Sequence, residues 1–453
     1  MKPRSGCLNL LGFADAGLSF DLNTNLALTA GFYIPYFKGN FYGNGHILSD
    51  LYLDQPGQSM LGLFGHLVNG TLTDLGVSGS VKGFEEVGGL TGRSGQDVTI
   101  NNTQSTVSVI GVNSVGGLVG RNWVGTIRNS YATGNVTGVN YVGGLVGVNF
   151  GTINNVYAIG SVAGELWVGG LVGDNSGTIN NTYATGNVTG DNYVGGLVGV
   201  NDGTIKNTYA IGSVTGNDHV GGLAGFNWFY ALITHSFWDI QTTGQSTSAG
   251  GVGLATAQMK TLANFNSATD ANGNTNPGWD ISAGTGGNTV WRLYEGQSYP
   301  VLRAFQQDLT VTANDAGKTY DGAAYSGGNG VTQSTTNALT GAISYGGSSQ
   351  GATNPDRYVI SPRVAMTPQD YQNWNVSYRD GVLTIDLVRP ASVEIWLAGQ
   401  TREPVSPSSS SQALPDSPTA AQAAGSGMPF LNLAPGFIRI EECSPTDTCS
   451  PVR

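Results

Sequence analysis

VGGLVGVNFGTINNVYAIGSVAGELW, which occupies residues 142–167, is the stretch of sequence that decides the fold. It is followed at once by a near copy at 168–193, VGGLVGDNSGTINNTYATGNVTGDNY, and by another at 194–219, VGGLVGVNDGTIKNTYAIGSVTGNDH. Further versions of the opening six residues begin at Met60, Val87, Val115 and Val220, so that successive starts lie 27, 28, 27, 26, 26 and 26 residues apart. A near-constant period of this length indicates a solenoid of similar, stacked turns.

Three columns of nearly identical residues appear when the copies are aligned. An isoleucine is followed after two residues by an asparagine, and after two more by a tyrosine. Because a spacing of two puts side chains on one face of a strand, we expect all three columns to face inward. Asparagines stacked on successive turns can then bond to one another. The predicted structural ladder consists of Ile153, Ile179 and Ile205 with Asn155, Asn181 and Asn207.

The fold class follows from the turn signals inside each repeat. Glycine, asparagine and aspartate separate three short segments that are rich in β-branched residues. The sequence therefore predicts an all-β chain, a β-helix or β-solenoid of about 26-residue coils. We expect roughly eight to nine coils between about residue 20 and residue 245. A small antiparallel β-domain and a disordered tail are expected to follow.

Composition divides the chain into four predicted parts. After the solenoid, Gly/Asn-rich sequence with aromatic anchors predicts a cap and joint, and short alternating runs then predict a β-domain. The last part is rich in Pro, Ser and Ala, which is typical of a disordered linker and tail. The predicted boundaries are 1–245 for the β-helix, 246–307 for the joint, 308–387 for the β-domain and 388–453 for the linker and tail.

Charge and hydropathy narrow the classes of partner. The formal net charge is 19 − 30 = −11. Since nucleic-acid binding depends on Lys and Arg that neutralise phosphates, we expect no nucleic-acid partner. No run of the sequence approaches the roughly 18 apolar residues of a spanning helix, so we also expect no membrane span.

No arrangement of residues in the sequence is typical of catalysis or of cofactor binding. The four histidines lack zinc-site spacing, and the glycine phrases lack the lysine of a phosphate loop. Asp174, Asp191, Asp202 and Asp218 fall in different columns, where we interpret them as turn residues and not as an acid/base pair. The sequence therefore predicts no catalytic residue, no cofactor and no metal ligand.

Aromatic residues precede the glycine phrase in successive turns. Tyr141, Trp167 and Tyr193 hold this position, and His219 replaces them in the next turn. One interpretation is that these rings stack on sugar rings of a glycan. The other is that they only shield the edges of strands. Both interpretations stay open from the sequence.

Cysteine is confined to the ends of the chain. Cys443 and Cys449 lie near the carboxyl end with five residues between them, and Cys7 stands alone. In a reducing compartment we expect two free thiols, or a metal-binding pair that lacks its other ligands. An exported chain would favour a small disulfide loop between Cys443 and Cys449.

The repeated Gly-Leu-Val-Gly with its trailing GTIxNxYAxGxVxG resembles the GLUG motif of bacterial surface proteins. These include filamentous haemagglutinin-like adhesins that are exported by two-partner secretion. LTVTANDAGKTYDGAAYSG at 309–327 and NWNVSYRDGVLTID at 373–386 resemble the small YDG or MBG β-domain of the same adhesins. The amino-terminal secretion domain and the long haemagglutinin repeats of that family have no counterpart here. The resemblance therefore implies the carboxy-terminal portion of such an adhesin.

The resemblance also implies a function. We expect a non-enzymatic surface or secreted bacterial protein that attaches to a host-cell glycan or an extracellular-matrix protein. An outer-membrane export partner is implied if the chain belongs to a full-length adhesin. Two alternatives remain: a β-helical polysaccharide-active enzyme, which needs carboxylates that converge on one face, and a purely structural stalk.

Overall fold

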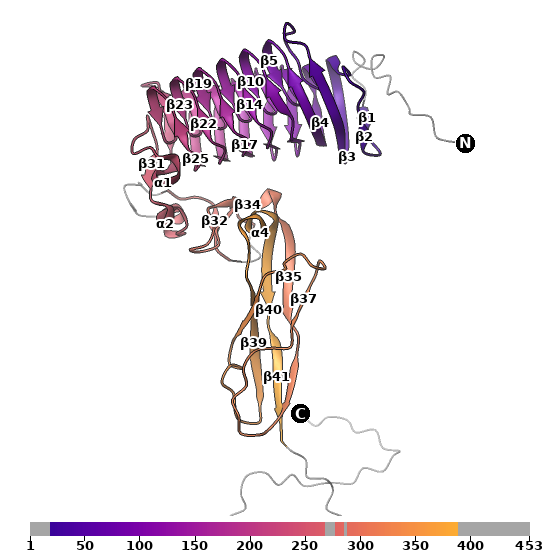
Figure 1. Ribbon diagram of the computed structural model, residues 1–453, viewed down its shortest axis with the longest axis vertical. Helices are drawn as coiled ribbons and strands as arrows, with labels where there is room; N and C mark the ends of the chain where they lie inside the picture. Colours follow the sequence, from indigo (N-terminus) through magenta and orange to yellow (C-terminus); the bar gives the residue numbers. More distant parts are fainter. Residues whose placement is uncertain (1–18, 268–276, 285–287, 388–453) are drawn as a thin grey trace, which may run out of the picture. The chain divides into compact units, whose positions relative to one another are not determined.

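The computed structural model describes residues 19–267, 277–284 and 288–387. Strands make up 53% of the structure and helices 6%, and a β-solenoid of about eight turns dominates the first half (Figure 1). The predicted all-β class and the predicted β-solenoid are therefore confirmed. The tail predicted at 388–453, with Cys443 and Cys449, lies outside the described residues.

A regular turn of the solenoid contains four strands, one more than the sequence predicted. The third strand is the longest, and the fourth is only two residues long. Each strand pairs in parallel with its copies in the turns before and after, so that Val142 lies opposite Val168 and Ile153 opposite Ile179. The turn that begins at residue 140 consists of β15 (Asn140–Gly143), β16 (Val146–Asn149), β17 (Thr152–Ala158) and β18 (Val162–Ala163).

Equivalent strands stack into four rows along the solenoid (Figure 1). The first row contains β5 (Glu85–Gly88), β10 (Asn113–Gly116), β15, β19 (Leu166–Gly169), β23 (Asn192–Gly195) and β27 (Asp218–Gly221). The second row contains β6 (Thr91–Ser94), β11 (Val119–Asn122), β16, β20 (Val172–Asn175), β24 (Val198–Asn201) and β28 (Ala224–Asn227). The third row contains β7 (Val98–Asn101), β8 (Gln104–Ser105), β12 (Thr126–Arg128), β13 (Tyr131–Ala132), β17, β21 (Thr178–Ala184), β25 (Thr204–Ala210), β29 (Leu232–Thr234) and β30 (Phe237–Asp239). The fourth row contains β9 (Ser108–Ile110), β14 (Val136–Thr137), β18, β22 (Val188–Thr189) and β26 (Val214–Thr215).

The turns at the amino-terminal end are less regular. Two long strands each run through most of a turn, and three register shifts interrupt the pairing between them. Phe37, Phe41 and Phe64 pack together in the bore at this end, with ring centroids 5.2–6.3 Å apart. The strands of this region are β1 (Ser19–Asp21), β2 (Leu26–Ala27), β3 (Ile34–Asp54) and β4 (Phe64–Lys82).

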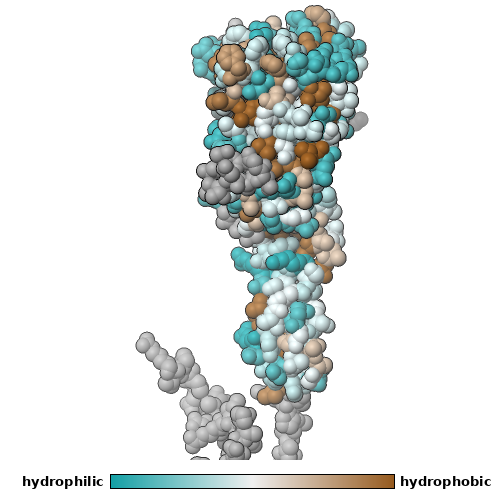
Figure 2. Space-filling view, turned by 90° about the vertical axis from the view of Figure 1, so that its left-hand side faces the viewer, coloured by the Kyte–Doolittle hydropathy of each residue, from teal (hydrophilic) through white to brown (hydrophobic). Residues whose placement is uncertain are grey.

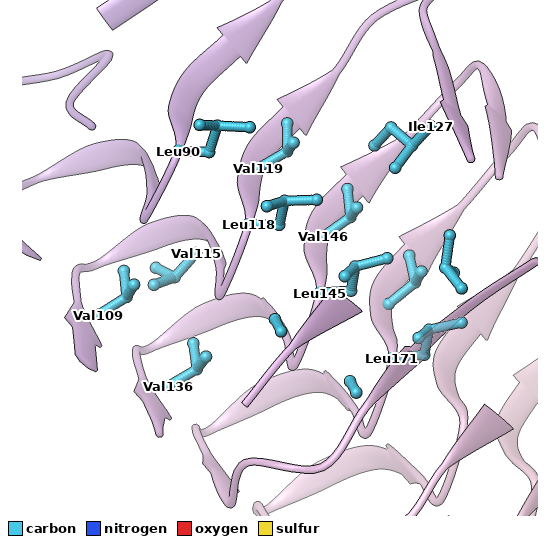
Figure 3. Packing of buried hydrophobic residues seen from close by; sticks show 14 of the residues in the cluster. Leu90, Val109, Val115, Leu118, Val119, Ile127, Val136, Leu145, Val146 and Leu171 are labelled. Atoms are coloured by element: carbon cyan, nitrogen blue, oxygen red, sulfur yellow. The ribbon is translucent and has the colours of Figure 1, made fainter. Parts of the chain in front are cut away.

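The bore is filled by a leucine and several valines from each repeat. Leu145 and the equivalent leucines of neighbouring turns are fully buried and lie one above the other (Figure 3). The backbone passes very close to itself just before each leucine. A Cβ on Gly143 would lie 2.0 Å from the carbonyl oxygen of Val146, and one on Gly144 would lie 2.2 Å from that of Gly170. The backbone segments can therefore pass this close to each other only because the repeat has two adjacent glycines at this point.

The alternation of side chains breaks at one residue in each third-row strand. Asn155 has a φ of 52°, in the left-handed region, and this changes which of the following residues face inward. Ile153 before it and Val156 after it are both buried in the bore, whereas Tyr157 belongs to a different cluster outside it. The prediction that isoleucine, asparagine and tyrosine share an inward face is therefore wrong for the tyrosines.

The tyrosines form a stacked column on the outside of the solenoid. Successive ring centroids lie 4.7, 5.0 and 5.1 Å apart, and the rings are within 8° of parallel. Aromatic residues of the joint cover this column: Phe305 lies 4.8 Å from Tyr157, and Trp291 lies 6.0 Å from Tyr209, between ring centroids. The joint therefore packs along the side of the solenoid. The column consists of Tyr131, Tyr157, Tyr183 and Tyr209.

A second asparagine ladder lies inside the solenoid. Each side-chain Nδ2 donates to the Oδ1 of the asparagine in the next turn, at 2.7–2.8 Å. The same nitrogens also donate to a glycine carbonyl at the following corner. The sequence prediction overlooked this ladder, although each copy shares the pattern Val-Gly-x-Asn or a close relative of it. Its members are Asn122, Asn149, Asn175, Asn201 and Asn227.

The carboxy-terminal end of the bore is closed by a single tryptophan. Trp238 follows Ala210 in its column, is buried with the bore residues, and donates from Nε1 to the Gln245 carbonyl at 2.9 Å. Phe237 packs outside the bore, against Phe265 and Trp279. The elements that follow are α1 (Ile240–Thr243), β31 (Val252–Leu254), α2 (Thr256–Met259), α3 (Ala263–Asn266), β32 (Ile281–Ser282), β33 (Trp291–Arg292), β34 (Val301–Leu302) and a 3-10 helix at Arg303–Phe305.

The last described part consists of two small sheets with mixed pairing, where the sequence predicted antiparallel strands. Leu309 pairs with Val376 in parallel, whereas Ile360 pairs with Gly381 in an antiparallel ladder. The elements are β35 (Gln307–Ala313), β36 (Ala316–Thr319), β37 (Val331–Gln333), β38 (Ile343–Gly346), β39 (Arg357–Val364), α4 (Pro368–Asn373), β40 (Trp374–Arg379) and β41 (Gly381–Asp386). Within the described ranges, no helix has the length and apolar character needed to cross a membrane.

Candidate functional site: an aromatic and acidic groove

One position in each first-row strand has a left-handed backbone, and we call these residues the corner row. The φ angles are 55° at Tyr141, 59° at Trp167 and 56° at Tyr193. Left-handed backbone is uncommon for residues other than glycine and asparagine, and it is a marked outlier for bulky side chains. The corner row consists of Glu86, Ser114, Tyr141, Trp167, Tyr193 and His219.

The rings of the corner row contact one another along the solenoid. The centroid of Tyr141 lies 4.3 Å from that of Trp167, in an edge-to-face arrangement. Trp167 lies 6.5 Å from Tyr193, and Tyr193 stacks on His219 at 4.6 Å. The three aromatic residues singled out from the sequence therefore form one continuous strip, and His219 extends it as its place in the repeat predicted.

Two columns from the second row of strands face this strip. One column lies just before the asparagine that ends each strand, and the other follows that asparagine. We call them the facing columns. The first consists of Arg121, Val148, Asp174, Val200 and Phe226. The second consists of Trp123, Phe150, Ser176, Asp202 and Trp228.

Two cavities lie between the corner row and the facing columns. They have volumes of about 340 Å³ and 290 Å³, and Trp167 and Asp174 line both of them. The cavities are therefore adjacent, and we call the two together the groove. The larger is lined by Glu85, Glu86, Asn113, Ser114, Arg121, Tyr141, Val148, Phe150, Trp167 and Asp174. The smaller is lined by Trp167, Asp174, Ser176, Tyr193, Val200, Asp202, Phe226 and Trp228.

Charges at the amino-terminal end of the groove are neutralised within the chain. The buried Glu86 accepts a hydrogen bond from Arg93 Nε at 2.6 Å, and its Oε1 lies 3.6 Å from Arg121 Nη1. The hydrogen bonds that Arg93 donates to Glu86 raise the pKa of Arg93. The Arg121 guanidinium also lies over the rings of Trp123 and Phe150, 4.8 Å and 5.1 Å from their centroids. At this end, the Arg121 cation is therefore already stabilised by two aromatic rings and a carboxylate.

Charges at the other end are not neutralised in this way. Burial, and then the neighbouring Asp202 carboxylate, raise the pKa of Asp174 to about 6, against a smaller lowering by Arg121. Asp202 Oδ1 is buried without a hydrogen-bond partner, and a hydrogen bond to the same carboxylate raises the pKa of Tyr230. Within the described residues, neither aspartate forms an ion pair with a lysine or arginine.

The sequence interpretation of the aspartates needs correction. Asp174 lies inside strand β20 and is not a turn residue. It lines the same cavity as Asp202, although the two residues occupy different columns. Asp191 and Asp218 do not line the groove. The alignment did not single out the pair, because its members lie in different columns, on either side of the buried asparagine, and in successive turns.

The groove also contains aromatic residues that the sequence prediction overlooked. Phe226 lies 5.8 Å from Tyr193 and 5.2 Å from Trp228, between ring centroids. Trp228 is 44% exposed. Figure 2 looks at the carboxy-terminal end of the solenoid, where hydrophobic residues in brown lie among hydrophilic ones in teal. The sequence did contain a sign of these residues: Phe226 and Trp228 stand on either side of Asn227, a member of the recurring asparagine column.

The predicted structural ladder lies away from the groove. Ile153, Ile179 and Ile205 are fully buried and in register. The asparagine column is interrupted: Asn207 Nδ2 donates to Asn181 Oδ1 at 3.3 Å, but Asn181 Nδ2 donates to Asn154 at 3.4 Å. Asn155 Nδ2 donates to Asn129 at 3.4 Å. These bonds are longer than those of the buried ladder. The described residues contain no group of three His, Cys, Asp or Glu side chains that could hold a metal ion.

Comparison with known proteins agrees with the repeat structure. The family model of the GLUG motif matches residues 111–137 and 190–215. The resemblance to that motif is therefore confirmed for these two stretches of the β-solenoid.

One curated protein and one solved structure are similar to parts of the chain. Halomucin from Haloquadratum walsbyi is 40% identical over 86 residues, which span 18% of this chain and 1% of halomucin. The crystal structure of a candidate immunoglobulin A1 protease from Bacteroides ovatus has a TM-score of 0.35 at 20% identity, covering 56% of this chain and 82% of that one. A likeness at that level transfers no property.

Proposed function

We propose that this chain is a non-enzymatic, surface-exposed or secreted attachment protein, in which the solenoid presents the groove to a glycan. The observation that carries the proposal is the corner row. Three large aromatic rings are held in an unfavourable backbone conformation and line a groove with unneutralised carboxylates.

The cost of this arrangement argues for a role beyond folding. A left-handed backbone costs a residue with a Cβ about 1–2 kcal/mol, and strain of this kind clusters at functional sites. The other left-handed position of the repeat is occupied by Asn129, Asn155, Asn181 and Asn207, a residue type that tolerates the conformation. Asparagine would therefore satisfy the backbone at the corner row. Tyr141, Trp167 and Tyr193 are better explained by what their rings contact.

The chemistry of the groove suits a sugar chain. Aromatic rings offer large, rigid apolar faces, against which the C–H faces of sugar rings can pack. Carboxylates accept hydrogen bonds from hydroxyl groups. The cavities of about 340 Å³ and 290 Å³ lie at the small end of the range for ligand pockets. A linear ligand that places one ring in each cavity would use the groove along its length.

The comparisons support a surface role in outline. GLUG repeats, and the similarity over 86 residues to a protein named halomucin, favour a surface or secreted location. We further propose the finer features implied by the sequence: kinship with filamentous haemagglutinin-type adhesins, an outer-membrane export partner, and a YDG/MBG-type domain at 308–387. Host-cell glycans and extracellular-matrix proteins are the proposed partners.

The proposal is tested by binding of the purified full chain to a glycan and matrix-protein array. We expect specific, saturable binding that falls at least tenfold in Trp167→Asn. This variant keeps a residue suited to the left-handed backbone and removes only the ring. Ile159→Asn is the matched control, because Ile159 is 45% exposed in a neighbouring turn and does not line the groove. A folded chain that binds nothing on the array would instead make the solenoid a structural stalk.

A polysaccharide-active enzyme is the second candidate. The convergence of Asp174 and Asp202 favours it, because acid/base cleavage of a glycoside needs two carboxyl groups, one of them with a raised pKa. Release of new reducing ends from a polysaccharide panel, lost in Asp174→Asn, would establish this function. Intact polysaccharides after long incubation with a binding-competent chain would exclude it.

A further inference from the structure

The cavity at the carboxy-terminal end of the groove combines aromatic faces with two carboxylates. Trp167, Tyr193, Phe226 and Trp228 supply the rings, and Asp174 and Asp202 supply the charges. Aromatic faces attract cations through their quadrupole, most strongly where water is excluded. A neutral ligand that buried this cavity would leave the carboxylates desolvated and without a countercharge, which is costly. The ligand that fits is therefore cationic.

We propose that this cavity binds the protonated amino group of an amino sugar, a glucosamine-type unit whose nitrogen carries no acetyl group. The proposal rests on the proposed function, since it names the class of sugar that the groove selects. The ammonium group lies between Asp174 and Asp202, and the C–H face of the sugar packs on the exposed rings.

The amino-terminal end of the groove contains an internal precedent. There the Arg121 guanidinium lies over Trp123 and Phe150 and approaches the Glu86 carboxylate at 3.6 Å. Arg121 belongs to the same facing column as Asp174, and Trp123 belongs to the same column as Asp202. In the turns around Asp174, the chain supplies carboxylates and rings but no cation of its own. The ligand supplies it.

A buried atom and the charge of the chain both agree with a cationic ligand. Asp202 Oδ1 is buried and has no hydrogen-bond partner, so it can accept a bond from an ammonium without losing one. Arg121, whose positive charge lowers the pKa of Asp174, is itself paired with Glu86. A net charge of −11 also favours the approach of a polycationic chain.

The experiment compares two oligosaccharides of equal length by calorimetric titration into the full chain. One is an oligomer of glucosamine, and the other is the N-acetylated oligomer, which is neutral. We expect the glucosamine oligomer to bind at least tenfold more tightly at low salt. The preference should fall to less than twofold in the double variant Asp174→Asn, Asp202→Asn, and it should weaken in added salt, which screens charges.

Control variants test whether the preference depends on the carboxylates of this cavity. Asp191→Asn removes an exposed carboxylate of the same solenoid that does not line the groove, and it should leave the preference unchanged. Asp174→Val installs the residue that Val148 and Val200 place in the neighbouring turns, so it should fold even if the amide variants do not. Circular dichroism and thermal melts confirm folding of each variant.

The outcomes separate the inference from the proposed function. Equal or tighter binding of the acetylated oligomer would overturn the amino-sugar assignment and leave glycan attachment intact. So would binding of some other array glycan with no binding of either oligomer. A folded chain that binds no glycan and no matrix protein would remove both. A preference that survives the double variant would place the amino group elsewhere and also overturn the assignment.

Discussion

Asp174 stands where the neighbouring turns have Val148 and Val200. The three backbones are equivalent, so the fold does not need the carboxyl group. Its partly buried position raises the pKa of Asp174 from 3.8 to about 6. The folded state therefore holds the charged form at a cost, which is the pattern expected where a site is prepared for a ligand and not for stability alone.

Removing this charge should stabilise the protein at neutral pH. Because the folded pKa is raised, ionisation costs more in the folded state, and stability is lost as pH rises from about 4 to about 6. The difference in pKa corresponds to at most about 3 kcal/mol. We expect Asp174→Asn to unfold at higher temperature than the wild type at pH 7.5 and at a similar temperature at pH 4. Equal melting temperatures at both pH values would contradict the pKa assignment, and Asp191→Asn serves as the control.

The two asparagine ladders should differ in what they contribute. Asn175→Ala removes ladder bonds to Asn149 and Asn201 at 2.8 Å and leaves their polar atoms buried. At about 1–3 kcal/mol for each unsatisfied group, we expect the free energy of unfolding to fall by about 2–5 kcal/mol. Asn155→Gly keeps the left-handed backbone and loses one long bond, from its Nδ2 to Asn129 Oδ1 at 3.4 Å, so its cost should be under about 1 kcal/mol. Chemical denaturation of both variants measures the difference, and a similar loss in each would refute the distinction.

At the scale of whole strands, each strand of a regular turn pairs with the equivalent strands of the turns before and after it. Stability is therefore a sum over turns and over the contacts between neighbours. The stacked tyrosine column follows the same rule, since Tyr157, Tyr183 and Tyr209 hold equivalent places in successive turns.

Deleting one complete turn should leave the solenoid folded. Removal of residues 168–193 brings residue 167 next to Val194, so that every strand meets an equivalent neighbour and Tyr157 takes the place of Tyr183 beside Tyr209. We expect a cooperative thermal transition and unchanged β-type circular dichroism. Deleting 13 residues from 168 onward should abolish both, because half a turn takes every later strand out of register. Folding of the half-turn variant would contradict the nearest-neighbour account.

The repeat period was enough to predict the solenoid, because stacked turns place identical residues at a fixed spacing next to one another. It was not enough to orient every column. A single left-handed residue such as Asn155 changes which later side chains face inward, and side-chain spacing carries no sign of it. The aspartate pair was missed for a related reason. Asp174 precedes the buried asparagine of one turn and Asp202 follows that of the next, so the two residues fall in different columns although they line one cavity.

At the scale of the whole described chain, both ends of the solenoid are closed. Phenylalanines fill the bore at one end, and Trp238 fills it at the other. Open ends would present unpaired strands and apolar side chains to other copies of the chain. The joint adds a second cover, since Trp291 and Phe305 pack on the tyrosine column along the side.

Removing the joint should therefore cause association. A variant that ends at residue 245 keeps Trp238 but exposes Phe237, Tyr209 and the rest of the tyrosine column. We expect this variant to self-associate in sedimentation experiments, whereas a variant that ends at residue 306 stays monomeric. Monomeric behaviour of both, with equal melting temperatures, would mean that the joint does not protect the solenoid.

In each turn, the residues that fill the bore and the residues that line the groove can vary independently. The bore repeats nearly the same leucine, valine and asparagine in every turn, while the facing columns vary from arginine to valine, aspartate and phenylalanine on an unchanged backbone. A gene that gains or loses one 26-residue unit would add or remove one recognition slot, and a point change would rewrite a slot without retuning the core. Proteins built this way can diverge in what they recognise much faster than in how they fold, because different positions of the same repeat determine the two properties.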